Sequence, residues 1–127
     1  MTRPTVRIRA ASTASLKDFY ACAPPFRVRA WVVEDAACRI VGVAGLEYRG
    51  GVLKAFMDLA PGVEAKAHAR TFIHVARRVL AAARRTNMPV LAARDPNQPR
   101  SAAFLKHFGF VRMDGPDQEE IWRWRNS

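Results

Sequence analysis

Residues 57–70 read MDLAPGVEAKAHAR, and they join an apolar strand to a long helix through a turn at Pro61 and Gly62. The first N–H groups of a helix lack partners within it, so a strand, a turn of small residues and a helix start form a natural anion-binding site. The tightest positions here are alanine rather than glycine. The stretch therefore favours a ligand that carries phosphate, and it leaves open a loop that has lost such a ligand.

The helix after Pro61 is strongly patterned, and we expect it to cover residues 64–86. Its apolar residues recur every three or four positions, as on a buried helical stripe, at Phe72, Val75, Ala76, Val79, Leu80 and Ala83. Arginines recur every seven residues on another face, with two more beside them, at Arg70, Arg77, Arg84, Arg78 and Arg85. Such a row is more typical of a solvated face than of a nucleic-acid contact surface.

The residues before this stretch predict one strand, one short helix and an antiparallel meander. Residues 5–9 alternate apolar and basic side chains, as a half-buried strand does. Residues 12–21 predict a short helix that Ser12, Thr13 or Ser15 can cap. Three strands follow, joined by two turns, at residues 26–32, 38–48 and 52–59, with the turns at residues 34–36 and 50–51.

The residues after the long helix predict a buried strand, a helix and two closing strands, at residues 90–93, 101–108, 110–113 and 120–124. Residues 95–99 form a loop between the first two elements, and Gly109 ends the helix. In the last strand Trp122 and Trp124 share one face, so we expect both to lie in the core.

The length and composition indicate one domain. A chain of 127 residues can bury a real core but cannot form two independent ones. No apolar run approaches the roughly 20 residues of a membrane helix, and residues 1–9 lack the apolar block of a secretory signal. Cys22, Cys38 and the three histidines lack metal-ligand spacing. We therefore expect a mixed α/β domain in the cytoplasm, with two reduced cysteines and no metal.

The charge indicates what kinds of partner the chain attracts. The formal net charge is +10, and 17 of the 21 basic residues are arginine. The planar fork of arginine pairs with phosphate and carboxylate better than the lysine ammonium does. A charge of this size attracts polyanions. Three kinds of partner remain open at this point: nucleic acid, an acidic protein, and a ligand that carries several phosphates.

Residues 101–110, SAAFLKHFGF, place Gly109 and Phe110 after a short helix, behind a long helix and a short apolar strand. With the full order of strands and helices, this segment resembles the GNAT superfamily of acyl-CoA-dependent N-acyltransferases over residues 28–124. The chain also looks like the short GNAT-like proteins that phages and prophages encode. The resemblance implies an α/β fold with a central, mostly antiparallel sheet and a few helices.

The resemblance implies acetyl-CoA as the co-substrate, with its pantetheine arm in a gap between the strands at residues 52–60 and 90–93. The diphosphate would lie on the loop whose family pattern falls on residues 64–69, where Ala69 conforms and Glu64 and Ala67 depart. Backbone N–H groups make that contact, so the identity of the side chains is secondary. The residues implied in coenzyme binding are Leu59, Ala60, Lys66, Ala67, His68, Ala69, Arg70, Gln98 and Ser101.

Acyl transfer needs a base that takes a proton from the amine and commonly an acid that reprotonates the thiolate. Many members of the family have a tyrosine as this acid at the position of Leu105, which cannot donate a proton. Asp58, near the end of the fourth strand, is the first candidate for the base, Glu47 is the second and His68 is the third. Both carboxylates are also typical of surface or turn positions.

Three functions remain open from the sequence. The first is transfer of an acetyl group from acetyl-CoA to an amine of an unknown acceptor, with the basic surface predicting an acidic acceptor or partner. The second is an inactive GNAT-fold structural or interaction protein, such as a phage particle component or a host-directed phage protein, for which we expect a homo-oligomer or larger assembly. Nucleic-acid binding ranks last, because the aromatic residues occupy core positions rather than a basic face.

Overall fold

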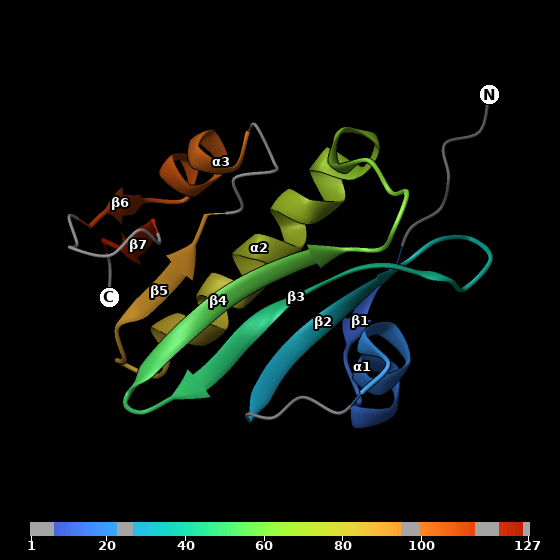
Figure 1. Cartoon of the computed structure of the whole chain (residues 1–127), viewed down its shortest axis with the longest axis horizontal. Coiled ribbons are helices and arrows are strands. Elements are labelled where there is room, and N and C mark those ends of the chain that lie inside the picture. Colours follow the sequence, from blue (N-terminus) through green and yellow to red (C-terminus); the bar gives the residue numbers. More distant parts are fainter. Residues whose placement is uncertain (1–6, 23–26, 95–99, 114–119, 126–127) are drawn as a thin grey trace.

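The computed structural model describes residues 7–22, 27–94, 100–113 and 120–125, which form one seven-stranded sheet with helices on both faces (Figure 1). The strand order is β1-β2-β3-β4-β5-β7-β6, and every pair of neighbours is antiparallel except β4 and β5. The strands are β1 (Arg7–Ala10), β2 (Val28–Glu34), β3 (Ile40–Arg49), β4 (Val52–Leu59), β5 (Val90–Ala93), β6 (Phe110–Arg112) and β7 (Ile121–Trp124). The helices are α1 (Thr13–Tyr20), the 3-10 helix η1 (Ala65–His68), α2 (Ala69–Arg84) and α3 (Ser101–His107).

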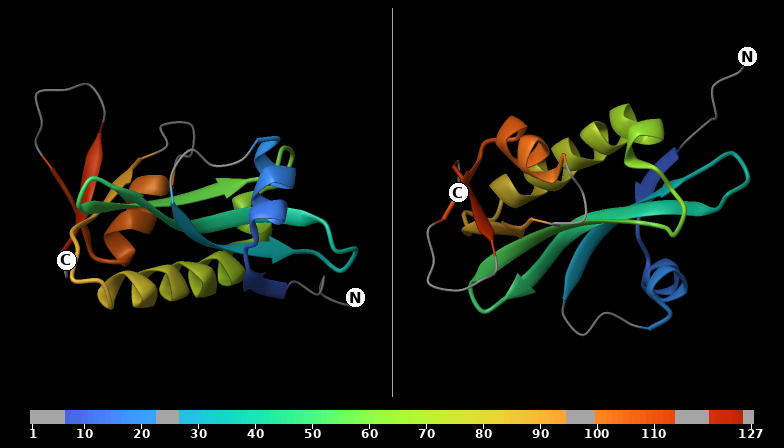
Figure 2. Two further views of the ribbon diagram at one scale, coloured as in Figure 1. Left: turned by 90° about the horizontal axis from the view of Figure 1, so that it is seen from below. Right: turned by 45° about the horizontal axis from the view of Figure 1, so that its top comes forward.

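The two faces of the sheet are covered by different helices. Helix α1 lies on one face, and α2 and α3 lie on the other (Figure 2). The α2 face holds the larger apolar cluster, which includes Leu53 and Val75. The α1 face holds a smaller cluster around Leu16 and Val43. Because side chains alternate along a strand, the odd-numbered residues of β4 face α2 and its even-numbered residues face α1.

The parallel strands β4 and β5 pair with each other over only a few residues. Strand β4 is in register with β3 over its whole length, from Val52 to Leu59. It is in register with β5 from Leu53 to Ala55 alone. Within the described residues, the edge of β4 from Phe56 to Leu59 therefore has no strand beside it, and the two strands diverge (Figure 1). The gap that the family resemblance implied is present.

The start of α2 packs closely against the sheet at Gly42. A Cβ atom on Gly42 would lie 2.7 Å from the ring of Phe72, so no larger residue fits there without moving that ring. Gly42 is paired with Leu59 at the end of β4. The close approach of Phe72 to Gly42 thus places the first turn of α2 next to the diverging end of β4.

Helix α1 begins at the first of the three predicted caps. Ser12 accepts a hydrogen bond from the N–H of Ser15 at 3.1 Å, and the hydroxyl of Ser15 accepts one from the N–H of Ser12 at 2.8 Å. This reciprocal pair is a capping box, which satisfies N–H groups that the helix cannot. The helix ends at Tyr20, and Ala21 follows in the left-handed region with φ of 61°.

Of the two turns predicted before the long helix, one is confirmed and the other is wrong in its first residue. The turn predicted at residues 34–36 is wrong in its first residue, because Glu34 ends strand β2. Glu34 is buried there, and its carboxylate accepts a hydrogen bond from Nε of Arg9 at 2.5 Å. The turn predicted at Gly50 and Gly51 is confirmed, with φ values of 51° and 87°.

The single helix predicted at residues 64–86 is in fact two elements. Residues 65–68 form η1, in which the N–H of Ala67 donates to the carbonyl of Glu64 at 3.2 Å, and α2 follows from Ala69. Neither start has a side-chain cap, so no side chain fixes an α-helical first turn. Helix α2 ends at Arg84, and Asn87 adopts a left-handed φ of 57° after it.

Candidate functional site

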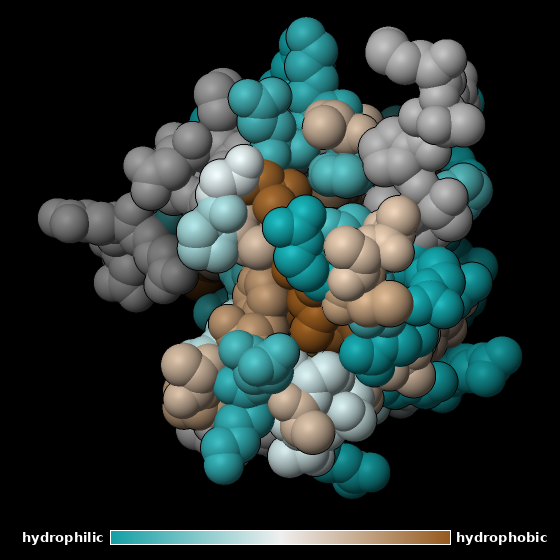
Figure 3. All heavy atoms as spheres, turned by 90° about the vertical axis from the view of Figure 1, so that its right-hand side faces the viewer, coloured by the Kyte–Doolittle hydropathy of each residue, from teal (hydrophilic) through white to brown (hydrophobic). Residues whose placement is uncertain are grey.

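A cavity of 510 Å³ lies where β4 and β5 diverge, and β4, β5, α2 and α3 line it. Its walls are mostly apolar and include Phe72 and Ile73 of α2 and Phe104 and Leu105 of α3. The end of the molecule towards which β4 runs shows apolar surface at its centre, with hydrophilic side chains around it (Figure 3). Small-molecule sites typically have volumes of about 300–1,000 Å³. The cavity, which we call the cleft, therefore has the size and lining of a ligand site.

Three cationic side chains line the cleft. They are Lys66 in η1, Arg94 directly after β5 and Arg100 directly before α3. Lys66 and Arg100 are exposed. Among the described residues that line the cleft, Asp58 is the one carboxylate. The side of the cleft formed by the helices and by the end of β5 is thus positively charged and attracts anions.

Arg94 is held in place by a hydrogen-bonded network. Its Nε donates to the hydroxyl of Ser101 at 3.1 Å, and its Nη1 lies 3.4 Å from Oε2 of Glu120. Nε1 of Trp122 donates to the same oxygen at 3.0 Å, and Arg112 lies 3.2 Å from the other oxygen. The Trp122 hydrogen bond, followed by the two guanidinium groups, lowers the pKa of Glu120. The network fixes the β5 wall of the cleft to β6, β7 and α3.

The α1 face of the sheet carries a tyrosine–carboxylate pair at the cleft. The hydroxyl of Tyr20 donates to Oδ2 of Asp58 at 2.5 Å. Asp58 is exposed and lines the cleft, while Tyr20 is half-buried at the end of α1. Burial raises the pKa of Tyr20, and the hydrogen bond to Asp58 and the charges of Asp58 and Glu47 raise the pKa further. Tyr20 therefore keeps its proton and orients the Asp58 carboxylate.

Glu47, the second predicted base, lies on the same face but is engaged elsewhere. Its Oε2 accepts a hydrogen bond from Nε of Arg49 at 2.8 Å, and Nη2 of Arg49 lies at the same distance. Glu47 is one of the residues that raise the pKa of Tyr20, yet it does not line the cleft. Of the two residues, Asp58 is the one that lines the cleft.

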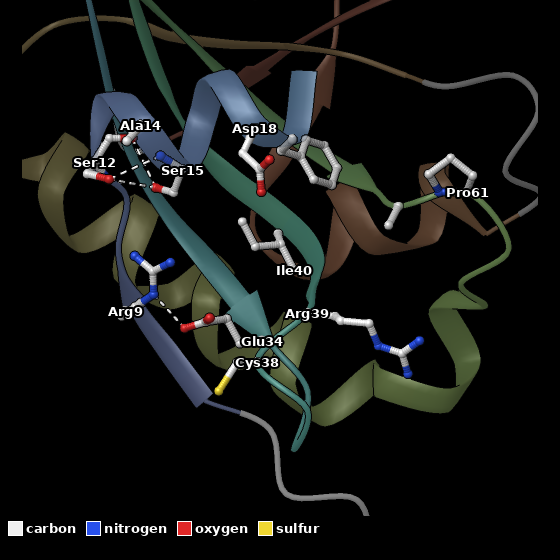
Figure 4. Close-up of a pocket in the computed structure, with 12 residues that line it drawn as sticks. Arg9, Ser12, Ala14, Ser15, Asp18, Glu34, Cys38, Arg39, Ile40 and Pro61 are labelled. Carbon is white, nitrogen blue, oxygen red and sulfur yellow. Dashed lines mark hydrogen bonds and ion pairs between the residues drawn. The ribbon is translucent and has the colours of Figure 1, made fainter. Parts of the chain in front are cut away.

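A second cavity, of 820 Å³, lies on the α1 face between α1, β1, the turn after β2 and the end of β4 (Figure 4). We call it the α1 cavity. Ala60 lines the α1 cavity, whereas the residue before it, Leu59, lines the cleft. Figure 4 shows Arg9 bonded to Glu34 and the side chain of Asp18 directed from α1 towards Ile40. Both cavities therefore reach the end of β4.

The predicted coenzyme-binding residues divide into two groups. Those that line the cleft are Leu59, Lys66, Ala69 and Ser101. Ala60 lines the α1 cavity instead, because it lies beyond the end of β4. Leu105, at the position of the family's acid, also lines the cleft and makes that part of the wall apolar.

The remaining predicted residues lie elsewhere. Ala67, His68 and Arg70 line neither cavity. Ala67 and His68 belong to the 3-10 turn η1, and Arg70 lies in the first turn of α2. The ring of His68 packs edge-on against Phe72 with 6.4 Å between centroids, and Arg70 is exposed. Gln98 lies outside the described residues.

Three residues of the site were missed from the sequence, namely Tyr20, Arg94 and Arg100. The contact of Tyr20 with Asp58 joins residues 38 positions apart in the chain. No local pattern contains such a pairing. Arg94 and Arg100 flank residues 95–99, where the sequence predicts a loop, and two cations on either side of such a segment after a buried strand were a usable signal.

Other features of the described residues bear on the site. Cys22 and Cys38 are both free and exposed. In residues 7–22, 27–94, 100–113 and 120–125, no group of three or more His, Cys, Asp or Glu side chains is arranged to hold a metal ion. No helix in the described part of the chain combines the length and apolar character needed to span a membrane.

No family model and no curated protein matches this sequence, whereas solved structures match the fold. A GNAT-family acetyltransferase of Staphylococcus aureus matches with a TM-score of 0.66 and 10% identity, over 94% of this chain and 98% of that one. The spermidine/spermine N-acetyltransferase SpeG of Vibrio cholerae matches with a TM-score of 0.62 and 16% identity, over 94% and 92%. A dodecameric spermidine N-acetyltransferase of Vibrio cholerae matches with a TM-score of 0.61 and 16% identity, over 93% and 91%. The chain therefore has the predicted α/β fold, that of the GNAT acetyltransferases.

Proposed function

We propose that this chain is an N-acyltransferase that moves an acetyl group from acetyl-CoA to an amine. The observation that carries the proposal is the cleft of 510 Å³ beside the unpaired end of β4, with cations on one side and Asp58 at its α1 face. The solved structures with the same fold are N-acetyltransferases, which supports this chemistry.

The residues of the cleft fit coenzyme A. Backbone N–H and C=O groups need partners, and the pantetheine arm offers amides that can take the place of a strand beside residues 56–59. The apolar side chains Phe72 and Phe104 suit the alkyl parts of this arm. Lys66, Arg94 and Arg100 supply positive charge for the phosphates.

The departures from the family loop are compatible with this fit. Ala69 lines the cleft at the first turn of α2, where helical N–H groups lack partners in the helix. Lys66 adds a cation at the same place. Glu64, the least favourable departure, is exposed and lines neither cavity, so its carboxylate can stay in solvent.

Asp58 is the proposed general base. The amine nitrogen bonds to the acetyl carbon of acetyl-CoA as the C–S bond breaks, the carboxylate of Asp58 accepts the proton that the amine gives up, and the released coenzyme A thiolate takes a proton from water. Tyr20 holds this carboxylate through its hydrogen bond and acts as a positioning residue. A positioned base typically contributes about 10²–10⁴-fold to the rate. Leu105 donates no proton, so placing the two substrates together carries the rest of the rate enhancement.

The acceptor is proposed to approach from the α1 face, because Asp58 and the α1 cavity both lie there. Asp18 lines this cavity, and among the described residues it has no ion-pair partner. Asp18 and Asp58, two carboxylates without an ion pair among the described residues, attract a cationic amine. Spermidine is the first acceptor to test, since SpeG acts on spermidine and spermine.

Titration calorimetry with acetyl-CoA tests the proposal. We expect a dissociation constant below 1 mM, which corresponds to about 4 kcal/mol of binding free energy. A double variant with Lys66→Ala and Arg100→Ala should bind more weakly, whereas Lys106→Ala, an exposed change outside the cleft, should not. No heat and no thermal shift at millimolar acetyl-CoA would remove the proposal.

The second candidate is an inactive GNAT-fold protein that acts as a structural or interaction module, including a phage particle component. The apolar side chain of Leu105 in the cleft favours it. A neighbour of the same fold is a dodecamer, so we propose self-assembly as the form this role takes. Light scattering distinguishes the two, because a scaffold assembles without acetyl-CoA and shows no turnover. For either candidate we keep the cytoplasm as the proposed location of the protein before any assembly.

A further inference from the structure

The outer face of α2 is a strip of exposed cations. The five exposed arginines, which we call the arginine face, are Arg70, Arg77, Arg78, Arg84 and Arg85. Residues 65–94 contain no Asp or Glu to neutralise them. Among the described residues, no ion pair involves these five, and Arg84 lies 5.5 Å above the ring of Trp124. None of the five lines the cleft.

The sheet next to α2 adds two arginine–aromatic stacks. Trp31 and Tyr48 are half-buried and pack against the apolar cluster that α2 covers, so both lie on the α2 face of the sheet. Arg29 lies 5.4 Å above the Trp31 ring, and Arg27 lies 5.4 Å above the Tyr48 ring. Helix α2 packs against both strands that carry these rings. The sequence pattern indicated that the aromatic residues occupy core positions. Trp31 and Tyr48 are instead only half-buried.

We propose that the arginine face and the two stacks bind single-stranded nucleic acid. Phosphates pair with the arginines of α2, and bases stack on the Arg29–Trp31 and Arg27–Tyr48 pairs. Aromatic rings and guanidinium planes reach base faces only where the bases are unstacked, so a single strand fits and a duplex does not. An acidic polypeptide would use the arginines but would gain little from the stacks.

The size and charge of the surface agree with this partner. Helix α2 has 16 residues and is therefore about 24 Å long, which matches a few nucleotides of an extended strand. The net charge of +10 attracts any polyanion, and the stacks supply the preference for bases. This role does not depend on acyl transfer, because the surface and the cleft share none of the five arginines.

Fluorescence anisotropy of labelled oligo(dT) and oligo(U), each of about 20 nucleotides, tests the proposal on the full chain without acetyl-CoA. We expect Arg77→Glu with Arg78→Glu to lower the affinity more than tenfold. The control, Lys17→Glu with Arg39→Glu, changes the charge equally at exposed positions outside α2 and should lower the affinity far less. Each arginine lost from the contact should reduce the slope of log affinity against log salt concentration by about 0.7. The tighter of the two oligonucleotides identifies DNA or RNA.

A second double variant, Trp31→Leu with Tyr48→Leu, tests the stacks separately from charge. It should weaken oligonucleotide binding severalfold and leave binding of inorganic polyphosphate unchanged, with circular dichroism confirming that the variants fold. Four results would overturn the proposal: tighter binding of a duplex, displacement by poly-glutamate at equal charge concentration, equal losses in the two charge-changed variants, or an unchanged oligonucleotide affinity in the aromatic variant.

Discussion

The two halves of β4 share an apolar character and differ in the strands beside them. Residues 53–55 are flanked by β3 and β5, and Leu53 is fully buried with its N–H bonded to the carbonyl of Pro89 at 2.9 Å. Residues 56–59 have β3 on one side and the cleft on the other. Both halves are rich in apolar residues, so the apolar pattern alone does not separate them. The candidate site therefore lies where the pairing of β4 with β5 stops.

The closed half should carry much more of the stability than the open half. Leu53→Ala removes a fully buried side chain and should lower the free energy of unfolding by about 3 kcal/mol. Met57→Ala, in the open half, changes a half-buried side chain that lines the cleft, and it should cost less than about 1.5 kcal/mol. Urea unfolding followed by circular dichroism measures both. Equal losses would mean that the two halves are packed alike.

The open half should carry the chemistry. Asp58→Asn should lower kcat about 100-fold while leaving the affinity for acetyl-CoA unchanged. Glu47→Gln is the matched comparison, because Glu47 lies on the same face but is paired with Arg49 and should matter only a few-fold at most. A thioester-release assay with spermidine measures both. A larger effect at Glu47 than at Asp58 would reverse the assignment.

Filling the gap should block the coenzyme. Ala93 is exposed at the end of β5 and lines the cleft, so Ala93→Trp should weaken binding of acetyl-CoA about 30-fold, or 2 kcal/mol. The control is Val111→Trp, which adds the ring at an exposed position of β6 outside the cleft. Calorimetry compares the two variants. Unaltered binding in the Ala93 variant would place the coenzyme elsewhere.

The smallest effect concerns the β5 wall and depends on pH. Glu120 has a lowered pKa, so its charge stabilises the fold above its ordinary pKa of 4.5, and this contribution is lost as the pH falls through the lowered value. Glu120→Gln should therefore be less stable than the unaltered chain at pH 7, and the difference should shrink as the pH falls below 4.5. Thermal melts across this range measure it. A difference that stays constant with pH would argue against the ion pairs with Arg94 and Arg112.

The fold could largely be predicted from the sequence because its signals are local. The apolar stripe of α2 and the alternation of β2 to β4 each repeat within a short window, and the paired glycines mark their turn. The start of α2 was misplaced, since alanine-rich residues 65–68 suit a 3-10 turn as well as an α-helix. Glu34 was misplaced because only the neighbouring strand supplies its partner, Arg9.

The site could be predicted in part. Leu59, Lys66, Ala69 and Ser101 line the cleft because they adjoin the ends of elements that the family order locates. Tyr20 could not be found in the same way, since its role depends on how α1 crosses the end of β4. The stacks of Arg27 and Arg29 on aromatic rings likewise depend on strand pairing and on partial exposure.

The most direct test is a crystal structure of the chain with coenzyme A. We predict that the pantetheine arm lies between β4 and β5, along the backbone of residues 56–59, with the phosphates near Lys66 and Arg100. Coenzyme bound away from this gap, or strands β4 and β5 paired along their full length with no coenzyme between them, would contradict it.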